Sequence, residues 1–285
     1  MRLPSGRLAE ETGHTEHQAL VPGKVESAMA RYAPRIIITG ASSGIGAALA
    51  RLYGASGATL GLISRRKVEL ERVAADFANP AELYPLDVRD AASLTAAARH
   101  FTGKHGCPDI VIANAGISLG TMTEHAEDIP AFQEVLDINV MGIVNTFRPF
   151  IAGMRQQGSG ILAGIASVAG YRGLPGAAAY SGSKAAAISY LESLRVELRG
   201  SGINVITICP GYVATPMTEK NAYPMPFLME ADEAARRIAS VIARGRNYAV
   251  IPWQMAIAAR LLRVLPNWLF DRLLAGAPRK ARRGH

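Results

Sequence analysis

Cysteine is scarce in this chain of 285 residues, which contains only Cys107 and Cys209. We therefore expect neither a disulfide framework nor a zinc site, and the two thiols fit a reduced core. Aromatic residues are also few, at 6%. A nucleic-acid interface would need basic residues interleaved with aromatic ones, so no nucleic-acid partner is expected. His14 and His17 stand three residues apart, which alone does not make a metal site, and we predict no bound metal.

The sequence has no internal repeat and no sustained apolar pattern before residue 35. Residues 1–34 scatter Gly, Pro, Glu, Thr and His, so we predict a disordered or loosely attached N-terminal extension. No secretory signal peptide is expected, because the first long apolar stretch is itself a predicted strand. Met29 stands just before that strand and is an alternative start of the natural chain.

A glycine-rich turn follows the first strand-like run. Residues 36–38 are β-branched and apolar, and an alanine-rich helical pattern follows the turn. Gly40 allows the tight turn, and Gly44 lets backbone N–H groups approach a pyrophosphate. Gly46 permits close packing of the helix whose positive end faces the anion. The residues of this turn that we expect at a dinucleotide are Gly40, Ser42, Ser43, Gly44, Ile45 and Gly46.

Tyr180 and Lys184 stand four residues apart in a helical pattern. Positions i and i+4 of a helix share one face with Cβ atoms about 5–6 Å apart, so both side chains would enter the same cleft. A fixed ammonium favours the phenolate of a neighbouring tyrosine and lowers its pKa from about 10. We therefore expect Lys184 to lower the pKa of Tyr180. A half-exposed helix face is the plainer interpretation of the pair taken alone.

Together these motifs resemble the short-chain dehydrogenase/reductase family. The Gly-x-x-x-Gly-x-Gly turn, Asn114-Ala115-Gly116, Ser167 thirteen residues before Tyr180, and Pro210-Gly211 occur in the family's order. The resemblance covers residues 35–252 and implies one catalytic domain. That domain would be a single doubly wound Rossmann-type α/β domain with a parallel sheet of about seven strands, which the alternation of strand-like and helical runs also favours. One departure is Ala113, where the family usually has a second Asn.

The resemblance implies a role for each motif residue. Tyr180 would donate a proton to a carbonyl oxygen while NADPH delivers hydride, Ser167 would hydrogen-bond that oxygen, and Lys184 would hold the cofactor ribose. Asn139 would kink its helix and hold a water linked to the lysine. The implied catalytic residues are Asn139, Ser167, Tyr180 and Lys184. The other implied cofactor contacts, besides Tyr180 and Lys184, are Asp87, Val88, Asn114, Ala115, Gly116, Pro210, Gly211, Val213 and Thr215.

The end of the second predicted strand indicates which cofactor is used. An acid there would bind the ribose 2′-hydroxyl, whereas an arginine accommodates a 2′-phosphate. This chain has Ser64, Arg65 and Arg66 and no acid at that point. We predict that NADP(H) is preferred over NAD(H), with Arg65 at the 2′-phosphate. Two solvated arginines at a helix start are the alternative interpretation.

The resemblance places a substrate lid at residues 218–229, which are rich in apolar side chains. We expect a lipophilic ketone or secondary alcohol as the small-molecule substrate, although a lid that packs on the core would show the same composition. The family also implies a homo-oligomer. A protein that senses the cofactor without catalysis, or a membrane-docked one with little catalysis, is the alternative to an enzyme.

Much of the formal charge of +8 lies in the C-terminal extension, residues 253–285. It has seven cations against the single acid Asp271, and Pro266 divides its apolar residues into two expected short amphipathic helices. Arg260 and Arg263 interrupt the apolar run, so no membrane span is expected. We predict an interfacial helix pair on an anionic membrane surface, with packing on the lid or a second subunit as the alternative. We expect a cytoplasmic location, free or peripheral at a membrane.

Overall fold

The computed structural model describes residues 33–219, 221 and 223–282. The predicted N-terminal extension, including the alternative start at Met29, lies outside the described residues apart from its last two positions.

A seven-stranded sheet forms the centre of the molecule, and all of its neighbouring strands run parallel. Its spatial order is β3-β2-β1-β4-β5-β6-β9. The strands are β1 (Arg35–Thr39), β2 (Thr59–Ile63), β3 (Glu82–Tyr84), β4 (Ile110–Ala113), β5 (Gly160–Ile165), β6 (Ile203–Pro210) and β9 (Tyr248–Ile251). A separate parallel pair joins β7 (Val213–Ala214) to β8 (Met229–Glu230). The predicted doubly wound α/β fold is confirmed.

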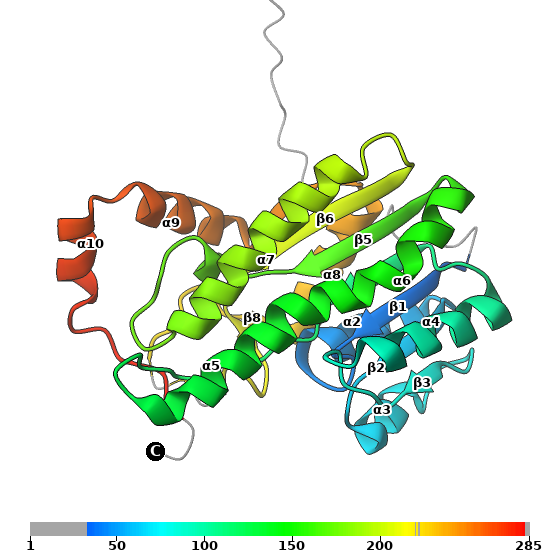
Figure 1. Ribbon diagram of the computed structural model, residues 1–285, viewed down its shortest axis with the longest axis horizontal. Coiled ribbons are helices and arrows are strands. Elements are labelled where there is room, and N and C mark those ends of the chain that lie inside the picture. Colours follow the sequence, from blue (N-terminus) through cyan, green and yellow to red (C-terminus); the bar gives the residue numbers. More distant parts are fainter. Residues whose placement is uncertain (1–32, 220, 222, 283–285) are drawn as a thin grey trace, which may run out of the picture.

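Helices cover both faces of the sheet, with α4, α6 and α7 on one face and α2 and α8 on the other (Figure 1). Their bounds are α2 (Gly44–Ala55), α3 (Lys67–Ala74), α4 (Ala91–His105), α5 (Ile129–Leu136), α6 (Gly142–Gln157), α7 (Ala178–Glu197) and α8 (Ala231–Ala243). A π-helical turn, Asp137–Met141, joins α5 to α6. The helix that Asn139 is expected to kink is therefore two helices with a wider turn between them.

The core follows from the alternation of side chains along each strand. Ile36 and Ile38 belong to the apolar cluster under α2 and α8, whereas Ile37 belongs to the cluster under α4, α6 and α7. All three are at most 1% exposed. Because both faces of the strand are buried, a continuous run of β-branched residues is the sequence that fits.

The chain reverses its direction of winding between β1 and β4, which are neighbours in the sheet. The loops that follow these two strands therefore diverge, and a crevice opens outside their carboxyl ends. Asn114, directly after β4, spans the gap behind the crevice. Its side-chain amide donates to the Thr39 carbonyl at 3.1 Å and its backbone N–H donates to the Thr39 hydroxyl at 3.1 Å. This holds the glycine turn and the β4 loop side by side along one cleft.

Two further helices, α9 (Trp253–Val264) and α10 (Asn267–Leu274), follow the last strand and extend to one side of the sheet (Figure 1). They are separated at Pro266, as the sequence predicts. Arg172 holds the corner between them, since its guanidinium donates to the Leu265 carbonyl at 2.7 Å and lies 4.1 Å from the Phe270 ring centroid. Within the described residues, no helix is both long and apolar enough to span a bilayer.

The glycine turn yields the first testable prediction. A Cβ added at Gly46 would overlap the carbonyl oxygen of Gly40, which is backbone and cannot move aside cheaply. We expect Gly46→Ala to destabilise the fold by about 1–3 kcal/mol, as overpacked sites do, and to abolish tight dinucleotide binding. Thermal unfolding and fluorescence titration with NADPH measure the two effects.

Gly103→Ala provides the matched control for Gly46→Ala. Gly103 lies near the end of α4 and a Cβ there would meet nothing within 4 Å. Since alanine favours the helix over glycine by about 0.5–1 kcal/mol, this variant should melt at the same temperature or slightly higher and bind NADPH normally. Equal behaviour of the two variants would contradict the proposed close packing at Gly46.

Candidate active site

A cleft of about 510 Å³ lies at the carboxyl ends of the central strands. It is lined by residues from the glycine turn, the β4 loop, α7 and the segment after β6. The predicted site residues on its wall are Gly40, Ser42, Ser43, Gly44, Ile45, Arg65, Asp87, Val88, Asn114, Ala115, Gly116, Ser167, Tyr180, Lys184, Pro210, Gly211, Val213 and Thr215. Gly46 and Asn139 lie behind the wall.

The glycine turn has the shape of a cradle for a pyrophosphate. Gly40 and Gly44 have φ angles of 69° and 54°, a region that glycine adopts without strain. A Cβ at Gly40 would lie 2.8 Å from the Ala115 Cα atom, and one at Gly44 would lie 2.9 Å from the Thr215 Cγ2 atom. Helix α2 starts at Gly44, so its free N–H groups and positive end face the cleft. These residues fit a bound dinucleotide.

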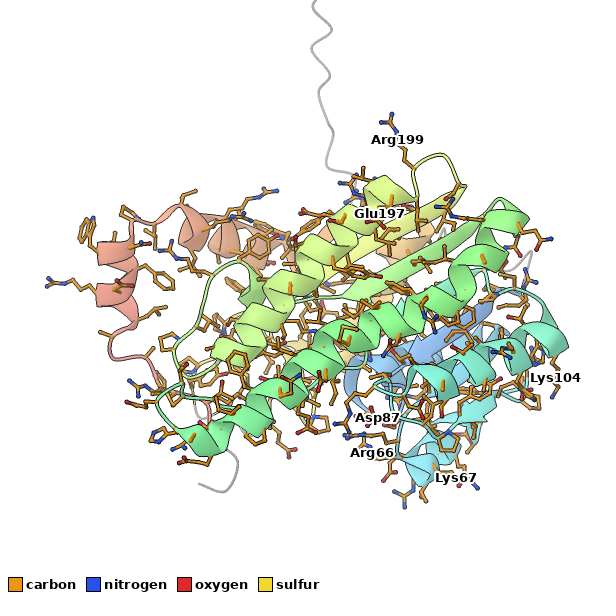
Figure 2. All side chains as sticks on the ribbon, viewed as in Figure 1. Arg66, Lys67, Asp87, Lys104, Glu197 and Arg199 are labelled. Carbon is orange, nitrogen blue, oxygen red and sulfur yellow. The ribbon has the colours of Figure 1, made fainter. Side chains whose placement is uncertain are left out.

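Two arginines lie at the end of the cleft next to the glycine turn. The Arg66 guanidinium donates to the Ser42 hydroxyl at 2.8 Å and to the Ser43 hydroxyl at 2.7 Å. Arg65 instead lies 3.8 Å from the Asp87 carboxylate. Figure 2 shows Arg66 and Asp87 in the same region, and both line the cleft. The carboxylate of Asp87 also pairs with Arg89 at 2.7 Å, and hydrogen bonds from Arg89 hold the pKa of Asp87 below its usual range.

Tyr180, Ser167 and Lys184 line the same cleft as the glycine turn. Tyr180 and Lys184 lie on the same face of α7, with the Lys184 Nζ atom 5.8 Å from the tyrosine ring centroid. Ser167 follows β5, where its hydroxyl accepts a hydrogen bond from the Ala169 N–H at 3.1 Å. The helix α7 and the turn after β5 therefore bring a phenol, an amine and a hydroxyl group into one cleft.

The expectation that Lys184 lowers the pKa of Tyr180 is wrong in this structure. Burial raises the pKa of Tyr180 above 10, and the neighbouring Ser167 hydroxyl only partly opposes this shift. The Lys184 Nζ atom donates to the Ile165 carbonyl at 2.9 Å and is itself buried, which lowers the pKa of Lys184 to about 8. Removal from water is therefore the dominant effect on both groups, and it drives each of them towards its neutral form.

Asn139 occupies the π-helical turn and is fully buried. Its side-chain oxygen accepts from the Ile117 N–H at 2.8 Å, and its amide nitrogen donates to the Ile117 carbonyl at 2.9 Å and to the Ser183 hydroxyl at 2.9 Å. A π-helical turn frequently marks a functional site. Here it lets one side chain join the β4 loop to the helix that carries Tyr180.

The model of the family described as "short chain dehydrogenase" matches residues 34–224 of this chain. The chain belongs to the short-chain dehydrogenase family. It is accordingly an NAD(P)-binding oxidoreductase that acts on CH–OH or C=O groups.

Relatives of the chain support this membership. It is 39% identical over 241 residues to an "Uncharacterized oxidoreductase" of Myxococcus xanthus, covering 82% of this chain and 94% of the relative. A "Monensin polyketide synthase putative ketoacyl reductase" of Streptomyces virginiae is 36% identical, over 65% of this chain and 72% of the relative. The crystal structure of a short-chain type dehydrogenase/reductase from Mycobacterium marinum matches with a TM-score of 0.72 and 26% identity, covering 80% and 97% of the two chains.

Several wall residues were not among the predicted ones. Arg66 is one of them, and its contact with Ser42 depends on a turn after β2 that the sequence does not specify. Ser118 lies two residues after Gly116. This closeness to a predicted cofactor motif is the feature of the sequence that could have placed it in the cleft. The wall residues that sequence reasoning left unassigned are Ser64, Arg66, Leu86, Ile117, Ser118, Leu119, Ile138, Ile165, Ala166, Pro216 and Met217, while Thr218 belongs to the predicted lid.

Replacing Tyr180 with Phe tests the proton donor. The variant keeps the ring and loses only the hydroxyl, so kcat for carbonyl reduction should fall by about a hundredfold or more. Binding of NADPH, followed by fluorescence, should stay within about twofold because the remaining cofactor contacts are untouched. A variant that turns over at the parent rate would show that Tyr180 is not the donor.

The raised pKa of Tyr180 gives the two reaction directions different pH profiles. Reduction needs the protonated phenol, which persists through pH 7–9, so titration of Tyr180 should not lower the reduction rate there. Alcohol oxidation needs the phenolate and should rise by up to about tenfold per pH unit over the same interval. Steady-state rates in both directions measure this, and an oxidation rate that levels off near pH 7 would mean that the pKa is lowered instead.

Proposed function

We propose that this enzyme interconverts a ketone and a secondary alcohol with NADP(H), and that its substrate is lipophilic. One observation carries the proposal: the Tyr180 phenol, the Ser167 hydroxyl and the Lys184 amine lie in the same cleft as the glycine cradle. A protein that only sensed the cofactor would need the cradle but not this trio. Consumption of NADPH by a panel of ketones graded in chain length tests the reaction and ranks the substrates.

The chain's own residues supply the proton and the orientation of the substrate. A bound NADPH would supply the hydride. Tyr180 would donate its proton to the carbonyl oxygen, while Ser167 donates a hydrogen bond to the same oxygen and fixes its position. Lys184 would bind the cofactor ribose, and Asn139 would hold the water that returns a proton to the site. The name of the Streptomyces virginiae relative, a putative ketoacyl reductase, agrees with ketone chemistry.

The preference for NADP(H) is supported by both arginines at the end of β2. Among the described residues, the Arg66 guanidinium has no carboxylate partner and bonds only to the hydroxyls of Ser42 and Ser43. A 2′-phosphate at this point would give it a charge-assisted partner. Arg65 would contribute a second cation, although it is partly neutralised by Asp87. We therefore assign the larger share of phosphate binding to Arg66.

Removing each arginine separately tests this assignment. Because a hydrogen bond to a charged group contributes about 1.5–3 kcal/mol, Arg66→Ala should weaken NADPH binding by about ten- to a hundredfold. The effect of Arg65→Ala should be smaller, and NADH binding should change little in either variant. Arg72→Ala, an exposed cation in the last turn of α3, is the control and should leave both affinities unchanged. A parent enzyme that prefers NADH would contradict the proposal.

A lipophilic substrate is supported by the segment between β7 and β8. These two-residue strands pair through Val213 and Met229, and Val213 lines the cleft, so the segment begins at the cleft wall and returns beside it. Met217, Phe227 and Leu228 on this segment are exposed apolar side chains, and Met217 also lines the cleft. An apolar surface beside the reacting group would bind the hydrocarbon part of a substrate.

We further propose that α9 rests on an anionic membrane surface. Trp253, Ile257, Leu261 and Val264, which we call the α9 stripe, follow helical spacing and are each at least 50% exposed. Arg260 and Arg263 flank the stripe, and in the described part of the chain neither forms an ion pair. Aromatic and aliphatic residues beside unpaired cations fit the interface of a bilayer with acidic headgroups.

Substitutions on the stripe test the membrane proposal without removing the end of the chain. Ile257→Gln with Leu261→Gln should leave folding and turnover intact, because both side chains are exposed. Since each buried aliphatic side chain contributes about 1.5–3 kcal/mol, vesicle binding should fall by at least about tenfold. Sedimentation with anionic vesicles measures this, and high salt should weaken the binding of the parent.

Val196→Gln is the control for this test, because Val196 is an equally exposed apolar residue at the far end of α7. It should sediment like the parent. If the parent never sediments, and the double variant instead dissociates an oligomer in gel filtration, the stripe is a subunit interface and the membrane proposal is wrong.

A further inference from the structure

The last described residues of the chain return from α10 to the cleft. We call residues 275–282 the C-terminal strap, which appears in red below α10 in Figure 1. Its backbone joins the loop after β4, where the Gly120 N–H donates to the Ala281 carbonyl at 3.1 Å. A Cβ at Gly120 would overlap the carbonyl oxygens of Lys280 and Ala281. The strap therefore packs directly on the loop that forms one wall of the active site.

Arg282 anchors the end of the strap. Its guanidinium donates to the buried carboxylate of Asp128 at 2.8 Å and to Glu127 at 2.9 Å. Asp128 also accepts from the Met122 N–H at 2.8 Å, so the same carboxylate holds both the strap and the wall loop. These bonds position the strap without any contribution from Lys280.

Lys280 stands two residues before this anchor and has different surroundings. Its Nζ atom donates to the Ser118 hydroxyl at 2.8 Å, and among the described residues no carboxylate lies within ion-pairing distance of it. The side chain is half-buried, and this burial lowers the pKa of Lys280. A cation that is partly removed from water beside a neutral hydroxyl is costly unless an anion completes its shell.

Ser118, which accepts the hydrogen bond from Lys280, is a residue of the active-site cleft. Ser118 lines the same cleft as Tyr180 and Ser167. It follows Gly116 by two residues, a chain reach of about 7 Å, and a Cβ at Gly116 would lie 3.5 Å from the Lys184 Nζ atom. The Ser118 hydroxyl therefore lies on the wall of the active-site cleft, and the Lys280 ammonium, which does not itself line the cleft, lies directly beside that hydroxyl.

We propose that Lys280 and Ser118 bind an acidic group of the substrate, so that the enzyme acts on a carbonyl or hydroxy compound that carries a carboxylate. The inference rests on the proposed oxidoreduction and narrows its substrate class. The carboxylate would accept hydrogen bonds from the Lys280 ammonium and the Ser118 hydroxyl, the carbonyl would lie at Tyr180, and the apolar segment between β7 and β8 would contact the chain between them. Lys280 is a specificity residue here and takes no part in the chemical step.

Matched pairs of acids and esters test the inference. A graded series of straight-chain oxo acids and their methyl esters would be reduced by the full chain with NADPH. In Lys280→Gln, kcat/KM for the acids should fall by about ten- to a hundredfold, the effect of losing a charged hydrogen bond, while the esters should be unaffected. The loss should appear in KM, with kcat nearly constant. Ser118→Ala should show the same pattern with a smaller loss.

Lys104→Gln is the matched control, because Lys104 pairs with Glu82 on the side of the molecule away from α10 (Figure 2). It should reduce acids and esters like the parent. If Lys280→Gln lowers turnover of acids and esters equally, the lysine only holds the strap in place and the inference is wrong. It is equally wrong if neither substrate series responds.

A binding measurement separates this inference from the proposed reaction. Calorimetric titration with octanoate and with octanol requires no turnover. Octanoate should bind the parent at least about tenfold more tightly than Lys280→Gln, whereas octanol should not distinguish them. If no ketone is reduced but octanoate shows this difference, the carboxylate site stands and the reaction fails. If ketones are reduced and octanoate binds both proteins alike, the reaction stands and the site fails.

Discussion

The buried amide of Asn139 joins the two halves of the active site, and the rest of the site depends on it. Its three hydrogen bonds engage both backbone groups of Ile117 and the hydroxyl of Ser183, which in turn donates to the Tyr180 carbonyl at 2.7 Å. The wall loop and the catalytic helix are therefore fixed relative to each other from inside the protein. A buried polar network of this kind is stable because each of its members has a partner. The π-helical turn is the local backbone change that lets the amide reach both elements.

The C-terminal strap fixes the same wall loop from the outside. Arg282 and the Gly120–Ala281 backbone contact hold the loop against the solvent side, while Asn139 holds its inner side. The loop after β4 is thus held on one side by Asn139 and on the other by the C-terminal strap. Asn139 lies within the part of the chain that matches the family, whereas the strap lies beyond residue 224, where that match ends. In these proposals the catalytic residues of the family determine the reaction. The strap selects the substrate, and α9 brings the enzyme to the membrane surface where that substrate lies. A lipophilic acid near a membrane surface is a substrate that satisfies both proposals.

The parts of the site that could be predicted from the sequence are those that depend on short spacings. Glycines at a fixed separation after a strand, and Tyr180 one helical turn before Lys184, bring groups together whatever the rest of the chain does. The directions of the Arg65 and Arg66 side chains depend on the turn after β2, so the sequence alone could not show that Arg65 lies beside Asp87 and Arg66 beside Ser42. The pKa of Tyr180 depends on burial by elements distant in sequence, which a spacing does not reveal. Lys280 and Ser118 lie 162 residues apart, so no local pattern could have joined them.

Transfer of deuterium from the cofactor to the product is the most direct test that this enzyme delivers hydride to a carbonyl carbon. NADPH deuterated on one face or the other of the nicotinamide C4 position would be incubated, in separate reactions, with the full chain and the best ketone. The alcohol would be analysed by mass spectrometry. We expect deuterium on the carbinol carbon from one of the two labelled cofactors and not from the other. NADPH that binds tightly but delivers no label to any ketone or keto acid would contradict this expectation and would leave a cofactor-binding protein without this chemistry.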